Sequence, residues 1–183
     1  LGISQDEALL FERLASRVLG TDGSLRAGAQ AVASNELGQS GLWPHGISGD
    51  LPILLVLVGA DREIPLVRQV LQAQEYWRLK GLTTDVVILN EHPDGYLDEM
   101  HAQLTALLTD GPWNTWQHRP GGAYLLRGER LSEAERALLA SAASAVLDGG
   151  RGDLAQQFDR LHPERPEPPP EAFVATTPVT ASA

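Results

Sequence analysis

The sequence predicts an α/β fold: a small three-layer α/β/α domain with a parallel sheet of about three strands, preceded by linker helices. The first observation is the longest apolar run of the chain, Leu51 to Val58, which is typical of a strand buried on both faces. The second is that shorter apolar runs alternate with helical periodicity after it. Such alternation requires crossover connections, which make the strands parallel and place helices against the sheet.

The N-terminal part of the chain is predicted to be helical. Ser4 and Glu7 have the spacing of a capping box, in which a hydroxyl and a carboxylate three residues apart satisfy free backbone amides. Apolar residues follow at helical spacing: Leu10, Leu14 and Val18. This helix is expected to end near Gly20, where turn-forming residues begin. An alanine-rich second helix is expected over residues 25–34, and the two helices make up a predicted linker region, residues 1–40.

Strands and helices are predicted to alternate through the α/β domain, which spans residues 41–162. The predicted strands are residues 51–58, 85–89 and 122–126. The predicted helices are residues 64–79, residues 96–108 with Asp94 as their cap, residues 132–147, and a last helix capped by Asp153. The proline-rich residues 163–183 are predicted to be a linker or a disordered tail, because prolines remove backbone donors and favour extended backbone.

The composition excludes several classes of function. The chain has 183 residues, enough for one domain with a sizeable core, and a formal net charge of −10 with a pI of about 4.8. Nucleic acids and anionic membrane surfaces require a basic face, so neither is an expected partner. The chain has no cysteine, which excludes disulfides and thiolate chemistry and suits a reducing compartment.

Nothing in the sequence has the pattern of a membrane segment or a signal peptide. The apolar runs are shorter than a transmembrane helix requires, and the first residues lack a basic region, so direct membrane insertion is not expected. Because the chain starts at Leu1 instead of Met, we expect it to be a segment of a longer protein.

Polar side chains follow the predicted strands. In open α/β sheets ligands bind outside the carboxyl ends of the strands, and right-handed crossovers bring these ends to one edge. The candidate ligand-binding or interface residues at this edge are Asp61, Asn90, Glu91 and Arg127. Glu91 is the single candidate for a catalytic acid or base. A metal site is not predicted, because the histidine after Glu91 has no second ligand at the i+4 spacing of a helix.

The loop before the first strand holds two further candidates, His45 and Asp50, beside two glycines. A phosphate-binding glycine loop follows a strand and opens a helix, whereas this loop precedes a strand. Its Gly-x-Ser-Gly spacing also differs from the Gly-x-Ser-x-Gly of a nucleophile elbow. We therefore interpret His45 and Asp50 as residues that brace the loop by hydrogen bonding.

Trp113 and Trp116 lie in an irregular segment before the third predicted strand. Tryptophan rings are amphipathic and common at interfaces, so these two could contact a sugar or a partner surface. The equal alternative is that they anchor a long loop.

A resemblance to a known family begins in the segment from Leu42 to Ile53, LWPHGISGDLPI. This segment resembles the cyclic β-1,2-glucan synthases and the related 1,2-β-oligoglucan phosphorylases. The likeness continues in five further segments: Val67–Leu71, Glu75–Leu82, Val87–Glu91, Arg136–Leu139 and Val146–Gly149. It covers most of residues 9–161.

The resemblance implies an internal segment of the phosphorylase-like C-terminal region of a large synthase that builds β-1,2-glucan from UDP-glucose. That segment would lie between sandwich and helical-barrel parts, at the cytoplasmic face of the bacterial inner membrane, and would itself be soluble. Its implied partners are the neighbouring domains of the same polypeptide and β-1,2-glucan, and no cofactor is implied for it. The Asp-x-Asp motif of the transferase does not occur in this sequence, and the phosphorylase acid belongs to the barrel. The segment alone is therefore expected to be inactive.

Three hypotheses for the function follow. The principal one is a non-catalytic α/β module of a cyclic β-1,2-glucan synthase, with a structural or glucan-contacting role. The alternative is a small carbohydrate-active enzyme at the carboxyl edge of the sheet, with Glu91 as acid or base and Arg127 holding an anion such as phosphate. The third is a pure protein-interaction module that exposes an apolar patch rimmed by Trp43 and the first helix.

Overall fold

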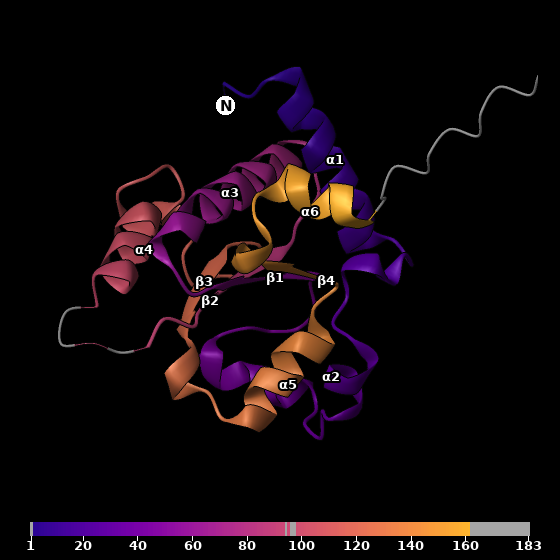
Figure 1. The fold of residues 1–183 in the computed structure, drawn as a ribbon, viewed down its shortest axis with the longest axis vertical. Coiled ribbons are helices and arrows are strands. Elements are labelled where there is room, and N and C mark those ends of the chain that lie inside the picture. The colour runs from indigo at the N-terminus through magenta and orange to yellow at the C-terminus, as the bar shows by residue number, and fades with distance from the viewer. Residues whose placement is uncertain (1, 94, 96–97, 162–183) are drawn as a thin grey trace, which may run out of the picture.

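The protein folds around a four-stranded parallel sheet with the strand order β3-β2-β1-β4 (Figure 1). The computed structural model describes residues 2–93, 95 and 98–161. The strands are β1 (Ile53–Val58), β2 (Asp85–Asn90), β3 (Ala123–Arg127) and β4 (Ala145–Asp148). β1 pairs with β2 on one side and with β4 on the other, so the longest apolar run of the chain forms an interior strand of the sheet.

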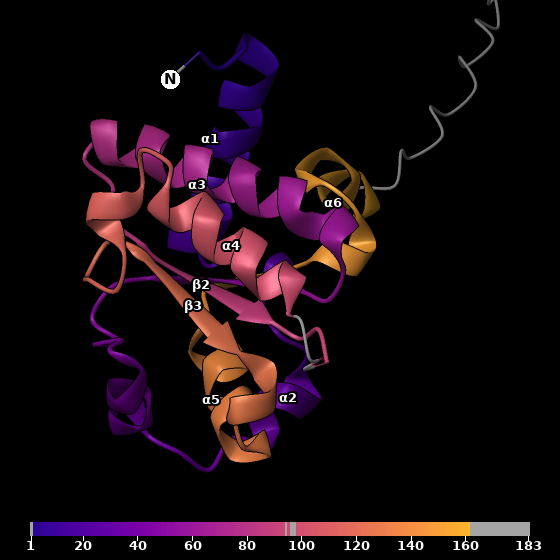
Figure 2. The ribbon, with the colours of Figure 1, turned by 90° about the vertical axis from the view of Figure 1, so that its left-hand side faces the viewer.

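Helices cover both faces of the sheet, which confirms the predicted three-layer α/β/α class (Figures 1 and 2). One layer contains α1 (Gln5–Leu19), α3 (Ile64–Leu79), α4 (Glu99–Thr109) and α6 (Leu154–Leu161). The other layer contains α2 (Ala29–Ala33) and α5 (Glu133–Ala142), together with the 3₁₀ segment η2 (Gln39–His45). Shorter 3₁₀ turns follow three of the strands: η3 (Asp61–Glu63), η5 (Gly128–Arg130) and η6 (Gly149–Arg151).

The predicted count of about three strands is corrected to four. The sequence predicts one helix over residues 132–147, but that helix ends at Ala142, and residues 145–148 form β4. The amide of Ser144 donates to the Ile53 carbonyl at 2.8 Å, which leads the chain onto the free edge of β1. Alanine and leucine favour a helix here, and pairing with β1 overrides that local preference.

The other element boundaries agree with the sequence to different degrees. α1 begins at the predicted capping box, where the Ser4 amide donates to Glu7 and the Glu7 amide to the Ser4 hydroxyl. The alanine-rich helix is shorter than predicted, since only Ala29–Ala33 is α-helical. α4 begins at Glu99 with Asp98 as its N-cap. The predicted start at residue 96 and the predicted cap Asp94 lie outside the described residues.

Two apolar cores lie on opposite faces of the sheet. The side chains of alternate residues of β1 enter different cores, which is why the whole strand is apolar. α1, α3, α4 and α6 share one core, and η2 and α5 close the other. The buried indole of Trp77 in α3 donates to the Phe11 carbonyl of α1 at 2.8 Å, so α1 packs directly against α3. None of the helices in the described part of the chain is long and apolar enough to cross a membrane.

Asp85, the first residue of β2, is a fully buried carboxylate at the amino end of the sheet. One of its oxygens accepts from the Gly121 amide at 2.7 Å, while Oδ2 has no hydrogen-bond partner among the described residues. Burial raises the pKa of this carboxyl above its ordinary value, against the Gly121 hydrogen bond, and the charge of Asp50 adds to the rise. Ionisation of Asp85 at neutral pH therefore lowers the free energy of unfolding.

Asp85→Asn is expected to raise the free energy of unfolding at neutral pH, because the amide removes the buried charge and keeps an acceptor for Gly121. A raised folded pKa means that this cost appears as pH rises above the unfolded value of about 3.8. Urea unfolding at a series of pH values should therefore show the advantage shrinking as pH falls through the folded pKa and absent below about 3.8.

Asp85→Ala is the matched control, since it removes the charge and the acceptor together. It is expected to cost about 1–3 kcal/mol relative to Asp85→Asn because the Gly121 amide loses its partner. Equal stability of the two variants would contradict a role for Asp85 as the acceptor of the Gly121 amide. An Asn variant less stable than the wild type at neutral pH would contradict a destabilising buried charge at this position.

Candidate functional site

The sheet has one topological switch point, between the carboxyl ends of β1 and β4. The connections from β1 to β2 and from β2 to β3 run through α3 and α4 on one face, and the connection from β3 back to β4 runs through α5 on the other. Ligands of open α/β sheets bind at such points. A cleft of about 300 Å³ lies there, lined by Arg62, Glu63, Pro65, Leu66, Gly149, Gly150, Gly152, Asp153 and Gln156.

The walls of this cleft are held together by close packing around Glu63. The side chain of Glu63 is buried and accepts from the Gly59 amide at 2.7 Å. A Cβ at Gly149 would lie 2.7 Å from Glu63 Oε2 and 2.8 Å from its Cβ, so only glycine fits at that position. Gly152 has a φ of +94°, a conformation that L side chains rarely adopt.

The other polar groups of the cleft bond to one another. The Asp153 amide donates to Gln156, and the Gln156 amide donates back to Asp153, which caps α6. Arg62 lies 3.4 Å from Glu63 Oε1, and its side chain is 80% exposed. The cleft therefore has the position of a ligand site, but its polar groups brace the turn from β4 into α6.

The predicted residues at the ends of β2 and β3 form ion pairs with neighbouring helices. Glu91 Oε1 accepts from Arg136 Nη1 of α5 at 2.9 Å. Arg127 Nη1 donates to Asp98 Oδ2 of α4 at 2.5 Å. Asn90 is buried and its Oδ1 accepts from the His92 amide. Asp61 lies exposed in η3 at the end of β1.

A second pocket at the end of β3 brings together one predicted residue from the loop and one from the edge. It has a volume of about 230 Å³ and is lined by His45, His101, Arg127, Arg130, Leu125, Leu126 and Leu131. His45 Nε2 lies 3.0 Å from Glu135 Oε1, so this histidine braces η2 against α5. His101 and Arg130 were not predicted as site residues. The sequence indicates Arg130 as a site residue only by its position three residues after Arg127.

The remaining predicted residues lie away from this edge. Asp50 precedes β1 and accepts from Gln39 Nε2 at 3.1 Å, a contact within the loop. Trp113 is only 6% exposed and belongs to the core shared with α4. Trp116 is partly buried, and the guanidinium of Arg78 lies 3.8 Å from the centre of its ring. Both tryptophans thus pack the loop before β3 against the helices.

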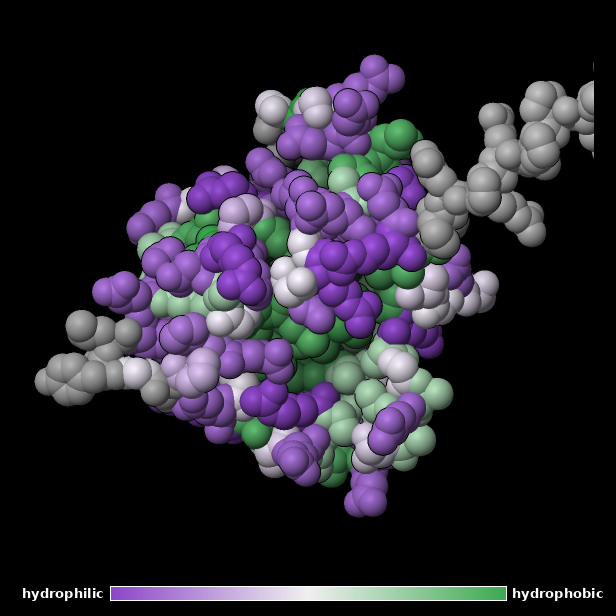
Figure 3. All heavy atoms as spheres, in the orientation of Figure 1, coloured by the Kyte–Doolittle hydropathy of each residue, from purple (hydrophilic) through white to green (hydrophobic). Residues whose placement is uncertain are grey.

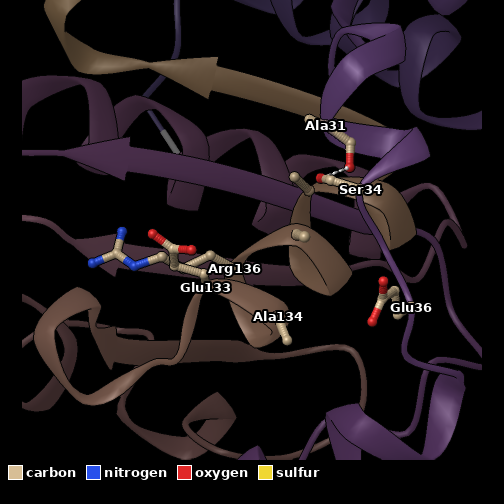
Figure 4. Close-up of a pocket in the computed structure, with 8 residues that line it drawn as sticks. Ala31, Ser34, Glu36, Glu133, Ala134 and Arg136 are labelled. Carbon is tan, nitrogen blue, oxygen red and sulfur yellow. Dashed lines mark hydrogen bonds between the residues drawn. The ribbon is translucent and has the colours of Figure 1, made fainter.

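A larger cavity, about 590 Å³, lies between α2 and α5 (Figure 4). It is lined by Ala31, Ser34, Glu36, Glu133, Ala134, Arg136, Ala137 and Ala140. The hydroxyl of Ser34 donates to the Ala31 carbonyl, and the labelled charged side chains do not converge on one point in the cavity (Figure 4). Small side chains from two helices make this a groove, which we call the alanine groove.

Two carboxylates beside the β3 pocket are held in the ionised form. The pKa of Asp98 is lowered chiefly by the hydrogen bond from the His101 amide, with contributions from Arg127, His101 and His92, although burial opposes the shift. The pKa of Glu135 is lowered chiefly by hydrogen bonds from Ser132, and His45 contributes. Neither carboxylate lines the pocket itself.

Asp98→Asn is expected to lower the free energy of unfolding at neutral pH, because asparagine still caps α4 but no longer pairs with Arg127. A depressed folded pKa gives stability that is present above the unfolded value of about 3.8 and is lost as pH falls through the folded pKa. The deficit measured by urea unfolding should therefore vanish in acid. Asp98→Ala should cost about 1 kcal/mol more at every pH, because the cap is lost as well; a pH-independent deficit for the asparagine variant would contradict the ion-pair role.

The sequence of the chain is similar to part of a known protein. No protein-family model matches it. It is 32% identical to the cyclic beta-(1,2)-glucan synthase NdvB of Rhizobium meliloti (strain 1021) over an aligned length of 168 residues, and the alignment covers 87% of this chain and 6% of the synthase. The chain thus spans a small part of the length of this relative. The resemblance expected from the motifs is confirmed: the chain is related to a short segment of a cyclic β-1,2-glucan synthase.

Proposed function

We propose that this chain is a non-catalytic α/β module of a cyclic β-1,2-glucan synthase that packs against neighbouring parts of the same polypeptide. The identity with NdvB extends along 87% of the chain, so it includes the sheet and both helical layers. The same match makes up 6% of the synthase, which leaves nearly all of that protein to carry the reaction.

The non-catalytic role is supported mainly by the contacts of Glu91, the candidate acid or base. Glu91 Oε1 accepts from Arg136 at 2.9 Å, and the ion pair joins the end of β2 to α5. The other strand-end groups make similar contacts, since Arg127 pairs with Asp98 and Asn90 binds a backbone amide. These contacts connect layers of the fold, and among the described residues they leave no convergent set of groups around a reacting atom.

The role in packing is supported by apolar surface on the α2 and α5 side of the sheet. Trp43 is 63% exposed, although its neighbour Leu42 and the nearby Ile47 are buried. The alanine groove is on the same side, and Figure 3 shows pale green side chains gathered over α2 and α5 where polar ones cover much of the opposite layer. Trp43 belongs to η2 in the layer of α2 and α5, while α1 lies in the opposite layer.

Glu91→Gln in the full-length synthase is expected to leave glucan production near the wild-type level when it is corrected for the amount of folded protein. The matched control is Arg136→Gln, which breaks the same ion pair from the other side. A bracing role predicts small and similar effects for both variants. A catalytic role predicts a loss of about a hundredfold or more for Glu91→Gln alone, and that result would overturn the proposal.

Trp43→Ala tests the packing role by comparing the chain alone with the full-length synthase. In the isolated chain the change should alter the free energy of unfolding by at most about 0.5 kcal/mol, because the ring is exposed. In the synthase it should speed limited proteolysis at this module, and Trp43→Phe should restore resistance because it keeps an aromatic ring. Unchanged proteolysis of the full-length alanine variant would contradict a domain contact at Trp43.

The same residue separates a domain contact from a glucan contact. Titration of the isolated chain with linear and cyclic β-1,2-glucans, followed by tryptophan fluorescence, should give no saturable change if the ring binds only protein. A saturable change that disappears in Trp43→Ala would assign the ring to glucan.

A further inference from the structure

The pocket at the end of β3, which we call the basic pocket, contains four nitrogen-bearing side chains, and the described residues of its lining include no carboxylate. His45 comes from η2, His101 from α4, Arg127 from β3 and Arg130 from η5, and three leucines complete the wall. The chain as a whole has a formal net charge of −10, so this concentration of basic groups is local. We propose that the basic pocket binds a phosphate group, either as the free ion or as a small monoester.

Two of the basic side chains, Arg127 and His45, are held by carboxylates before any ligand binds. Asp98 Oδ2 holds Arg127 at 2.5 Å, and Glu135 Oε1 lies 3.0 Å from His45 Nε2. Both carboxylates contact these side chains from outside the pocket lining. Ordering of long side chains is part of the cost of binding, so residues already held by ion pairs lose less freedom when a ligand binds.

Arg130 supplies the positive charge that these two pairs do not. The Arg127–Asp98 pair is neutral overall, and the His45–Glu135 pair is at most neutral. Arg130 is exposed at the pocket and forms no ion pair with another described residue. A guanidinium has five N–H donors in a planar fork that matches the oxygens of a phosphate, so Arg130 is the residue best suited to hold the ligand.

The size and walls of the basic pocket favour a small ligand. Its volume of about 230 Å³ is below the range of about 300–1,000 Å³ that is typical of pockets for drug-sized molecules. Leu125, Leu126 and Leu131 line it with apolar surface, which strengthens nearby charge interactions relative to open solvent. The switch-point cleft makes a useful contrast, since Glu63 and Asp153 in its lining would repel a phosphate.

The test is a titration of the chain with inorganic phosphate and with glucose 1-phosphate, at constant ionic strength, followed by amide chemical shifts in NMR. Both should give saturable shifts around residues 125–131, and glucose, which lacks the phosphate, should give none. The compound that binds more tightly identifies the free ion or the monoester as the natural form. Absence of saturable shifts with both phosphates would overturn the proposal.

Arg130→Gln is expected to weaken phosphate binding about tenfold or more, which corresponds to about 1.4 kcal/mol. The side chain is exposed and makes no ion pair with the described residues, so the variant should fold normally, as its spectrum would verify. Arg62→Gln is the matched control, because it removes one exposed arginine at the switch-point cleft and should leave the affinity unchanged. An equal loss in both variants, or none in Arg130→Gln, would show that the pocket is not the site. These readouts are independent of glucan production, so they stand or fall separately from the proposed function.

Discussion

The structure depends on the pairing of β1 with two parallel neighbours. β1 aligns with β2 from Ile53 to Val58 and with β4 from Leu54 to Leu57, so both of its edges are used. Its side chains alternate between two cores, and helices must cover both faces to remove them from water. The position of every crossover, and therefore of the switch-point cleft and the basic pocket, follows from this central strand.

Much of the fold could be predicted because local signals and tertiary packing agree. α3 was predicted with its exact bounds, Ile64–Leu79, since the apolar stripe, the early proline and the glycine that follows it all indicate the same helix. β4 could not be predicted, because residues 145–148 have helical neighbours and ordinary helix-forming composition. Only the unpaired edge of β1, which is distant in sequence, makes this segment a strand.

The candidate site was predictable in its location and less so in its contacts. Sequence reasoning placed Asn90, Glu91 and Arg127 at the carboxyl ends of strands, where the structure has them. It could not show that Arg136 approaches Glu91 or that Asp98 holds Arg127, because those partners come from helices whose rotation is set by packing. His101 and Arg130 became relevant only when the fold brought α4 and η5 around one pocket.

The contact between Gly149 and Glu63 limits how this module can diverge. Any Cβ at position 149 would collide with the Glu63 side chain, whose carboxylate in turn satisfies the Gly59 amide. A larger residue at 149 therefore requires a residue without a Cβ at 63 or a shift of the backbone, and loss of the Glu63 carboxylate leaves the amide after β1 in need of another acceptor. The three positions 59, 63 and 149 lie in two distant loops and constrain one another, so a graft between related chains should carry both loops together.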